Sequence, residues 1–126
     1  MKGITKDWLD SSSDDLKIIA KIIDDETLTH QIAFHAQQAI EKALIEEYEI
    51  GLIRTHSLET LIAKTNKYLE LHVDITIIKK LDQLYIDARY PGDFGLSPNS
   101  KPAIDEALHL EQVAKEIYNR VCIHLE

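Results

Sequence analysis

Apolar residues recur along most of this chain at alternating steps of three and four, the repeat that places side chains on one face of an α-helix. The longest such row lies near the C-terminus and consists of Ala103, Ala107, Leu110, Ala114, Ile117 and Val121. Similar rows predict helices over about 5–24, 29–49, 57–68, 74–88 and 102–124. No segment alternates apolar and polar residues, so no β-strand is predicted.

These rows predict an all-α fold, an up-and-down antiparallel bundle of four long helices plus one short helix over 57–68. Glycines and prolines gather between residues 91 and 102, and no linker divides the chain, so residues 1–126 are expected to form a single domain. The second helix carries Ala36, Ala39 and Ala43 on its inner face, which lets another helix approach closely. That helix belongs either to the same core or to a second copy across a dimer seam.

The charged residues narrow the set of partners. The chain has 22 Asp and Glu against 14 Lys and Arg, a formal net charge of −8. Sequence-independent binding to nucleic acid relies on Lys and Arg that neutralise phosphates, so this excess of acid argues against general nucleic-acid binding. It leaves room for a local basic pocket that takes one small anion.

The sequence predicts a cytoplasmic protein. No run approaches the roughly 18–20 apolar residues that cross a membrane. The first residues lack the apolar segment of a signal peptide. The single Cys122 excludes an internal disulfide and suits a reducing compartment.

Neither a metal nor another cofactor is predicted, although the chain has six histidines. His30 and His35 are five residues apart, which places them about 140° from each other around a helix, a poor arrangement for shared ligation. Glu106 and His109 form one Glu-x-x-His pair, whereas di-iron bundles use two such pairs. No nucleophile elbow or glycine-rich phosphate loop is present, so no catalytic residue is assigned.

The segment from Arg54 to Ser57 directly precedes the short helix and is a candidate anion site. Thr55 or Ser57 would cap that helix, and the first N–H groups of a helix favour an anion. Arg54 adds a forked donor and His56 a titratable one. The alternative is a plain helix cap with Arg54 paired to a surface acid such as Glu49.

A second candidate site lies where the fourth helix is predicted to end. Tyr85, Arg89, Tyr90 and Phe94 gather there, and Tyr90 stands before Pro91, which favours an extended backbone and ends the helix. Aromatic faces and a guanidinium together suit a nucleotide base and its phosphate. Equally, these side chains would close the end of the bundle, with Arg89 paired to a neighbouring aspartate.

Four short motifs, taken in order, resemble the HEPN domain over about residues 8–121. They are the early Trp8, then Gln37-Gln38-Ala39-Ile40-Glu41-Lys42-Ala43-Leu44, Arg54-Thr55-His56-Ser57-Leu58 and Ala88-Arg89-Tyr90-Pro91. The resemblance implies a helical bundle that forms a homodimer, similar to the C-terminal domain of kanamycin nucleotidyltransferase. It also implies a minimal nucleotidyltransferase as partner, often in a toxin–antitoxin pair, and an ATP- or GTP-type nucleotide as ligand. By the same resemblance, a nucleotide or partner groove would be lined by Gln38, Lys42, Arg54, His56, Arg89 and Tyr90.

The sequence departs from the HEPN ribonucleases in one respect. Their motif is an arginine followed, after four to six residues, by a histidine, but Arg89 has no histidine at that spacing. Arg120 and His124 come near to it, with only three residues between them. The resemblance therefore favours a non-catalytic nucleotide-binding or accessory subunit. The alternative is a divergent ribonuclease toxin that uses His56 in place of the missing histidine.

Overall fold

The computed structural model describes residues 3–45, 57–67, 69–89 and 101–125. Its elements are α1 (Gly3–Ile22), the short 3-10 helix η1 (Glu26–Leu28), α2 (Thr29–Ile45), α3 (Leu58–Thr65), α4 (Ile75–Arg89) and α5 (Ile104–Leu125). No strand occurs in these ranges, so the predicted all-α fold is confirmed. The sequence did not predict η1, which begins where the Asp25 carboxylate accepts a hydrogen bond from the Thr27 N–H at 2.9 Å.

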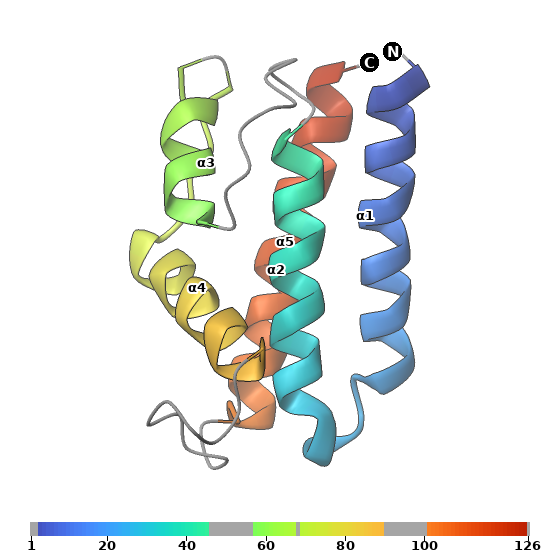
Figure 1. Ribbon diagram of the computed structural model, residues 1–126, viewed down its shortest axis with the longest axis vertical. Coiled ribbons are helices and arrows are strands. Elements are labelled where there is room, and N and C mark those ends of the chain that lie inside the picture. The colour runs from blue at the N-terminus through green and yellow to red at the C-terminus, as the bar shows by residue number, and fades with distance from the viewer. Residues whose placement is uncertain (1–2, 46–56, 68, 90–100, 126) are drawn as a thin grey trace.

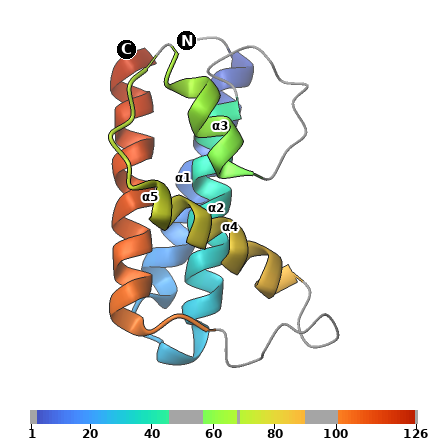
Figure 2. The same cartoon turned by 90° about the vertical axis from the view of Figure 1, so that its left-hand side faces the viewer.

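The four long helices alternate in direction along the chain, as predicted, and α2 is the central one (Figure 1). It contacts α1, α3, α4 and α5. Figure 2 shows that α4 crosses α2 obliquely, whereas α1, α2 and α5 are closely aligned. Since α4 crosses α2 obliquely, the bundle is less regular than the sequence pattern suggested.

Small residues explain why α2 has neighbours on so many sides. Ala36, Ala39 and Ala43 are fully buried within the chain, and so are three larger residues of the same helix, Ile32, Ile40 and Leu44. Alanine lets two helix backbones approach closely. The alternative that this face forms a dimer seam is therefore wrong, because the core of a single copy already covers it.

The row predicted for the last helix forms the buried face of α5, apart from its first member. Ala107, Leu110, Ala114, Ile117 and Val121 are buried. Ala103 instead precedes the helix and is exposed, and its carbonyl accepts the Ala107 N–H at 2.9 Å. The helix thus begins at Ile104, so Pro102 lies outside its first turn, contrary to the sequence-based expectation.

A non-helical segment between α3 and α4 returns alongside α5 (Figure 2). The Asn66 side chain accepts the Leu71 N–H at 2.9 Å, which fixes the turn that follows α3. Arg120 of α5 donates to the Glu70 carbonyl at 3.1 Å, and Leu69 and Leu71 are buried. These contacts hold residues 69–73 against the C-terminal half of α5.

Candidate functional site

A carboxylate from α1 joins two side chains of α2 in the seam between these helices. Asp15 Oδ2 lies 2.8 Å from Lys42 Nζ, and Asp15 Oδ1 lies 2.9 Å from His35 Nδ1. The exposed fractions of the three side chains are 7% for Asp15, 20% for His35 and 23% for Lys42. His35 and Lys42 are seven residues apart, which is two helical turns, so both face α1. We call these three residues the Asp15 cluster.

Ser12 lies one turn before Asp15 on α1 and fixes how close the two helices are. Its hydroxyl is fully buried and donates to the Ala39 carbonyl at 2.6 Å. A serine that bonds the backbone of a facing helix needs a small residue opposite, and Ala39 provides it. Ser12 therefore belongs to the inner face of α1.

Gln38 is half-buried and is the second predicted site residue that α2 carries. Its amide donates to Gln37 Oε1 at 2.9 Å, and the Gln37 amide donates to Glu41 Oε2 at 3.2 Å. Gln37 is fully buried and Glu41 nearly so. Gln38 and Lys42 are four residues apart, so they are neighbours on one helix face. With His35 they form what we call the α2 polar band, a set of side chains held by hydrogen bonds.

Aromatic contacts link the Asp15 cluster to α4. The rings of Phe34 and Tyr85 stack with their centroids 5.3 Å apart and their planes at 15°. The same Phe34 meets His35 edge-on, at 5.3 Å and 88°. The orientation of the His35 ring is thus set from two sides, by the carboxylate of Asp15 and by Phe34. A neutral His35 that donates from Nδ1 to Asp15 presents Nε2 as an acceptor.

The other four predicted site residues fall outside what the structure describes in full. Arg54, His56 and Tyr90 lie outside the described residues, and so does Asp93, one of the two aspartates proposed to pair with Arg89. The other, Asp87, lies in α4, but its side chain is not described. Arg89 is the last residue of α4, where the sequence predicted the helix to end, but its side chain is not described. The structure therefore brings Gln38 and Lys42 together on α2, and the grouping of all six residues stays a prediction.

A carboxylate of α4 occupies the N–H groups at the start of α3 that the sequence suggested for an anion. Ser57 caps this helix, as expected, since its hydroxyl accepts the Thr60 N–H at 3.3 Å. The Asp82 carboxylate accepts the N–H groups of Leu58 at 2.9 Å and Glu59 at 3.3 Å. Partial burial raises the pKa of Asp82, and these two N–H groups oppose the rise. The first donors of α3 are therefore already bound to an acid of the same chain and are not free for an external anion.

The histidines and carboxylates seen in the described part of the chain do not gather around a metal position. No three His, Cys, Asp or Glu side chains there are placed to hold a metal ion. Glu106, weighed above as a ligand, pairs instead with Lys80 at 3.1 Å. The prediction that the protein needs no metal is not tested by this finding.

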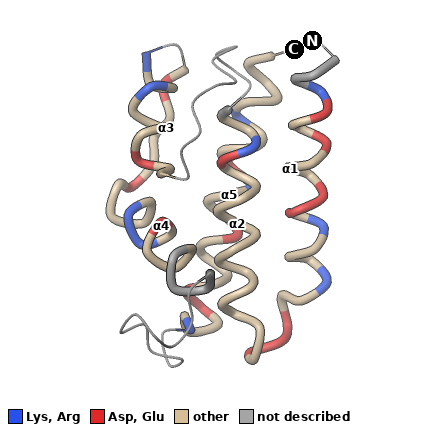
Figure 3. The backbone as a smooth tube through the Cα atoms, viewed as in Figure 1, with Lys and Arg blue, Asp and Glu red and all other residues tan. Residues whose placement is uncertain are grey.

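The charged residues of the described helices are mixed in sign. Figure 3 shows acidic and basic residues interspersed along α1, where Lys6 pairs with Asp10 at 3.0 Å and Lys17 lies 3.9 Å from Asp14. No continuous basic stripe runs along these helices (Figure 3). None of the described helices is long and apolar enough to cross a membrane.

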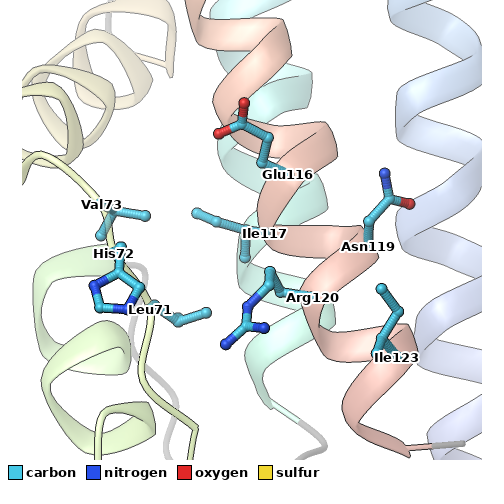
Figure 4. Close-up of a pocket in the computed structure, with 8 residues that line it drawn as sticks. All are labelled: Leu71, His72, Val73, Glu116, Ile117, Asn119, Arg120 and Ile123. Atoms are coloured by element: carbon cyan, nitrogen blue, oxygen red, sulfur yellow. The ribbon is translucent and has the colours of Figure 1, made fainter.

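A cleft that the sequence did not indicate lies between residues 71–73 and α5 (Figure 4). Its volume is about 370 Å³, and its lining is Leu71, His72, Val73, Glu116, Ile117, Asn119, Arg120 and Ile123. The sequence offered Arg120 only as a partner for His124. The fold places it opposite His72, which is 48 residues earlier, so no local motif could reveal the pair.

The fold and the α2 polar band define a small helical-bundle domain whose central helix carries polar side chains ordered by its neighbours. A family model for the HEPN domain matches residues 5–124, almost the whole chain. The protein therefore belongs to the HEPN family, as the four motifs suggested. Comparisons with curated proteins and with solved structures give no significant match.

Proposed function

We propose that this HEPN protein is a non-catalytic subunit that binds a nucleotide and acts as a homodimer with a minimal nucleotidyltransferase, in the manner of a toxin–antitoxin pair. HEPN domains are often paired with a nucleotidyltransferase. The observation that carries the proposal is the α2 polar band, where Gln38 and Lys42, two of the residues implied by the family, lie side by side and half-buried. Asp15 and Gln37 hold them in place before any ligand binds.

The contacts of Lys42 assign it a limited role in this site. One N–H of its ammonium group points to Asp15, which leaves two for a ligand, and the Asp15 carboxylate offsets its positive charge. A phosphate therefore needs cations whose charge is not already balanced by a carboxylate, and in the proposal these are Arg54 and Arg89. Lys42 and Gln38 then bind uncharged polar groups, such as those of a ribose or a base.

Two observations favour binding over catalysis. The sequence lacks the ribonuclease motif, because residues 94–96 after Arg89 are Phe, Gly and Leu. Asp15 holds His35 at Nδ1, an arrangement that suits proton transfer at Nε2, but catalysis of this family's type also needs an arginine beside the histidine. Arg120 is the one arginine whose side chain is described, and it lies on α5 with its guanidinium on the Glu70 carbonyl. No described arginine thus accompanies His35.

Calorimetric titration with ATP and GTP, with and without magnesium, tests the binding half of the proposal. We expect saturable heat with at least one nucleotide and binding weakened about tenfold or more in Arg89→Ala, since tenfold is about the effect of losing one strong contact. Lys79→Gln is the control. Lys79 is an exposed cation of the same helix, and its distance of 4.0 Å from Glu59 makes that ion pair a weak one. Absence of heat with both nucleotides would contradict nucleotide binding.

Light scattering of the chain alone, and mixed with a minimal nucleotidyltransferase encoded beside it, tests the assembly half. We expect a dimer alone and a larger complex in the mixture. A monomer that forms no complex with the nucleotidyltransferase would contradict the assembly half of the proposal. Incubation with RNA tests the alternative function, and cleavage that is abolished in His56→Ala would favour the ribonuclease over the accessory subunit.

A further inference from the structure

We propose that the cleft between residues 71–73 and α5 binds a small monocarboxylate with an apolar tail. The cleft shares no residue with the α2 polar band, so this inference goes beyond the proposed function. Its volume of about 370 Å³ lies at the lower end of the range found for small-molecule sites, roughly 300–1,000 Å³.

Four apolar side chains form the floor of the cleft and part of its walls. Leu71 and Ile117 are buried and form the floor, and Val73 lies on one wall. Ile123 lies on the other wall and is 63% exposed, the most exposed of the large apolar side chains in the described residues. A ligand with a hydrocarbon tail would cover Ile123 and remove this apolar surface from water.

Arg120 supplies the charge for the carboxylate. It extends from α5 towards the facing segment, where one Nη2 N–H donates to the Glu70 carbonyl at 3.1 Å (Figure 4). A guanidinium has five N–H donors, so most of its fork is left for a ligand. No ion pair joins Arg120 to a carboxylate of the described residues, although the chain has an excess of acid. His72, on the opposite wall, adds a ring nitrogen at the mouth.

The orientation of the Glu116 side chain explains why Arg120 forms no ion pair with it and leaves its guanidinium for a ligand. The two residues are four apart on α5, a spacing that favours an ion pair. The Glu116 carboxylate nevertheless points away from Arg120 in Figure 4, and its Oε1 accepts the Gln112 amide at 3.3 Å. A neighbouring α5 residue thus holds the nearest acid of the same helix face away from the guanidinium.

The lining also decides between kinds of anion. No Phe, Tyr or Trp lines the cleft, so it offers a nucleotide base no broad aromatic face for stacking. Arg120 is its one arginine, and Glu116 shares the rim, so a phosphate with nearly two negative charges fits poorly. A carboxylate has a single charge, and its two oxygens match the guanidinium fork.

NMR titration of the full chain with octanoate tests the proposal. We expect saturable amide shifts confined to residues 69–73 and 116–123. Octanoate should bind about tenfold or more tighter than butyrate, because each buried methylene strengthens binding about three- to fourfold. It should also bind about tenfold tighter than octanol, which lacks the charge-assisted hydrogen bonds.

Substitutions separate the two parts of the site. Arg120→Gln should weaken octanoate about tenfold and bring it level with octanol. Ile123→Ser should weaken octanoate and octanol alike. Lys115→Gln removes one positive charge from the same helix outside the cleft and should leave binding within about twofold of the wild type.

Several results would overturn the proposal. These are the absence of saturable shifts, equal binding of octanol and octanoate, unchanged binding in Arg120→Gln, or displacement of octanoate by inorganic phosphate at equal concentration. The comparison of octanoate, butyrate and octanol uses only the wild-type chain, so the test holds even where a variant fails to fold. Shifts centred on the exposed Ile18 and Leu108 instead of the cleft would show unspecific attachment and would also overturn it.

Discussion

Asp15 Oδ2 lies 2.8 Å from Lys42 Nζ, and this contact joins α1 to α2 between residues 27 positions apart. The carboxylate is nearly buried and also meets His35, so two partners offset the cost of removing it from water. A buried acid on α1 thus orders both His35 and Lys42, two of the three residues of the α2 polar band. Substitution of Asp15 is therefore expected to change both the stability of the protein and its binding of a ligand.

We expect Asp15→Asn to destabilise the protein by about 2–3 kcal/mol, because it leaves the half-buried Lys42 without its anion. Urea unfolding at pH 7 measures the loss. The double variant Asp15→Asn with Lys42→Met should recover part of it, since no charge is then left unpaired. Asp10→Asn, which breaks the exposed pair with Lys6, should change stability little. Equal losses in the two single variants would show that the Asp15 cluster is no more than a surface ion pair.

Ala36→Leu should destabilise the protein by about 1–3 kcal/mol, because the larger side chain has no room in the packed core. Ala36 is fully buried, on the helix that contacts four others. The measurement is the midpoint of thermal or urea unfolding. The exposed Ala20→Leu on α1 is the control and should stay near the wild type. A neutral Ala36→Leu would mean that the helices around α2 are loosely packed.

Asp82→Ala should destabilise the protein by about 1–2 kcal/mol, because two backbone N–H groups at the start of α3 lose their acceptor. Hydrogen exchange of the Leu58 and Glu59 amides should accelerate more than that of amides in α5. Asp14→Ala changes an exposed acid on α1 whose contact with Lys17 is long, at 3.9 Å, and it serves as the control. If the two amides exchange as slowly as in the wild type, Asp82 is not their acceptor in solution.

His30 should make stability depend on pH. Burial, and next the charge of Lys101, lower its pKa below the ordinary value of 6.5, so folding favours the neutral ring. The stabilising contribution is then complete above about pH 6.5 and is lost as the pH falls from 6.5 through the lower pKa of the folded state. His30→Gln removes this contribution to stability.

Urea unfolding of wild type and His30→Gln between pH 7.5 and 5 measures the effect. The stability of the wild type relative to the variant should fall on acidification, by less than about 1.4 kcal/mol per pH unit, the limit for one proton. Parallel curves, or a relative gain at low pH, would contradict the direction of the shift. His109→Gln, at an exposed position on α5, is the control for the substitution itself.

The apolar rows predicted every α-helix in the described part of the chain, because helix periodicity is a local property that neighbouring residues carry. Their ends were less well placed, as the start of α5 at Ile104 shows. The same rows identified the inner face of α2 but not the burial of Asp15 or Gln37. Periodicity shows where apolar residues lie. A buried polar residue can be recognised only from the hydrogen-bond or ion-pair partner that the fold brings to it.

By itself, the sequence determined the all-α class, the positions of the helices, the small-residue face of α2 and the membership of the HEPN family. Only the tertiary structure decided which side chains meet. It joined Asp15 to Lys42, Asp82 to the start of α3 and Arg120 to Glu70, across 27, 24 and 50 residues of chain. A repeat of three and four tells which face of a helix is buried, but the register between two helices depends on how their side chains pack together. For that reason the sequence could not show that the first N–H groups of α3, expected to bind an anion, donate to Asp82. It could not show the cleft beside Arg120 either.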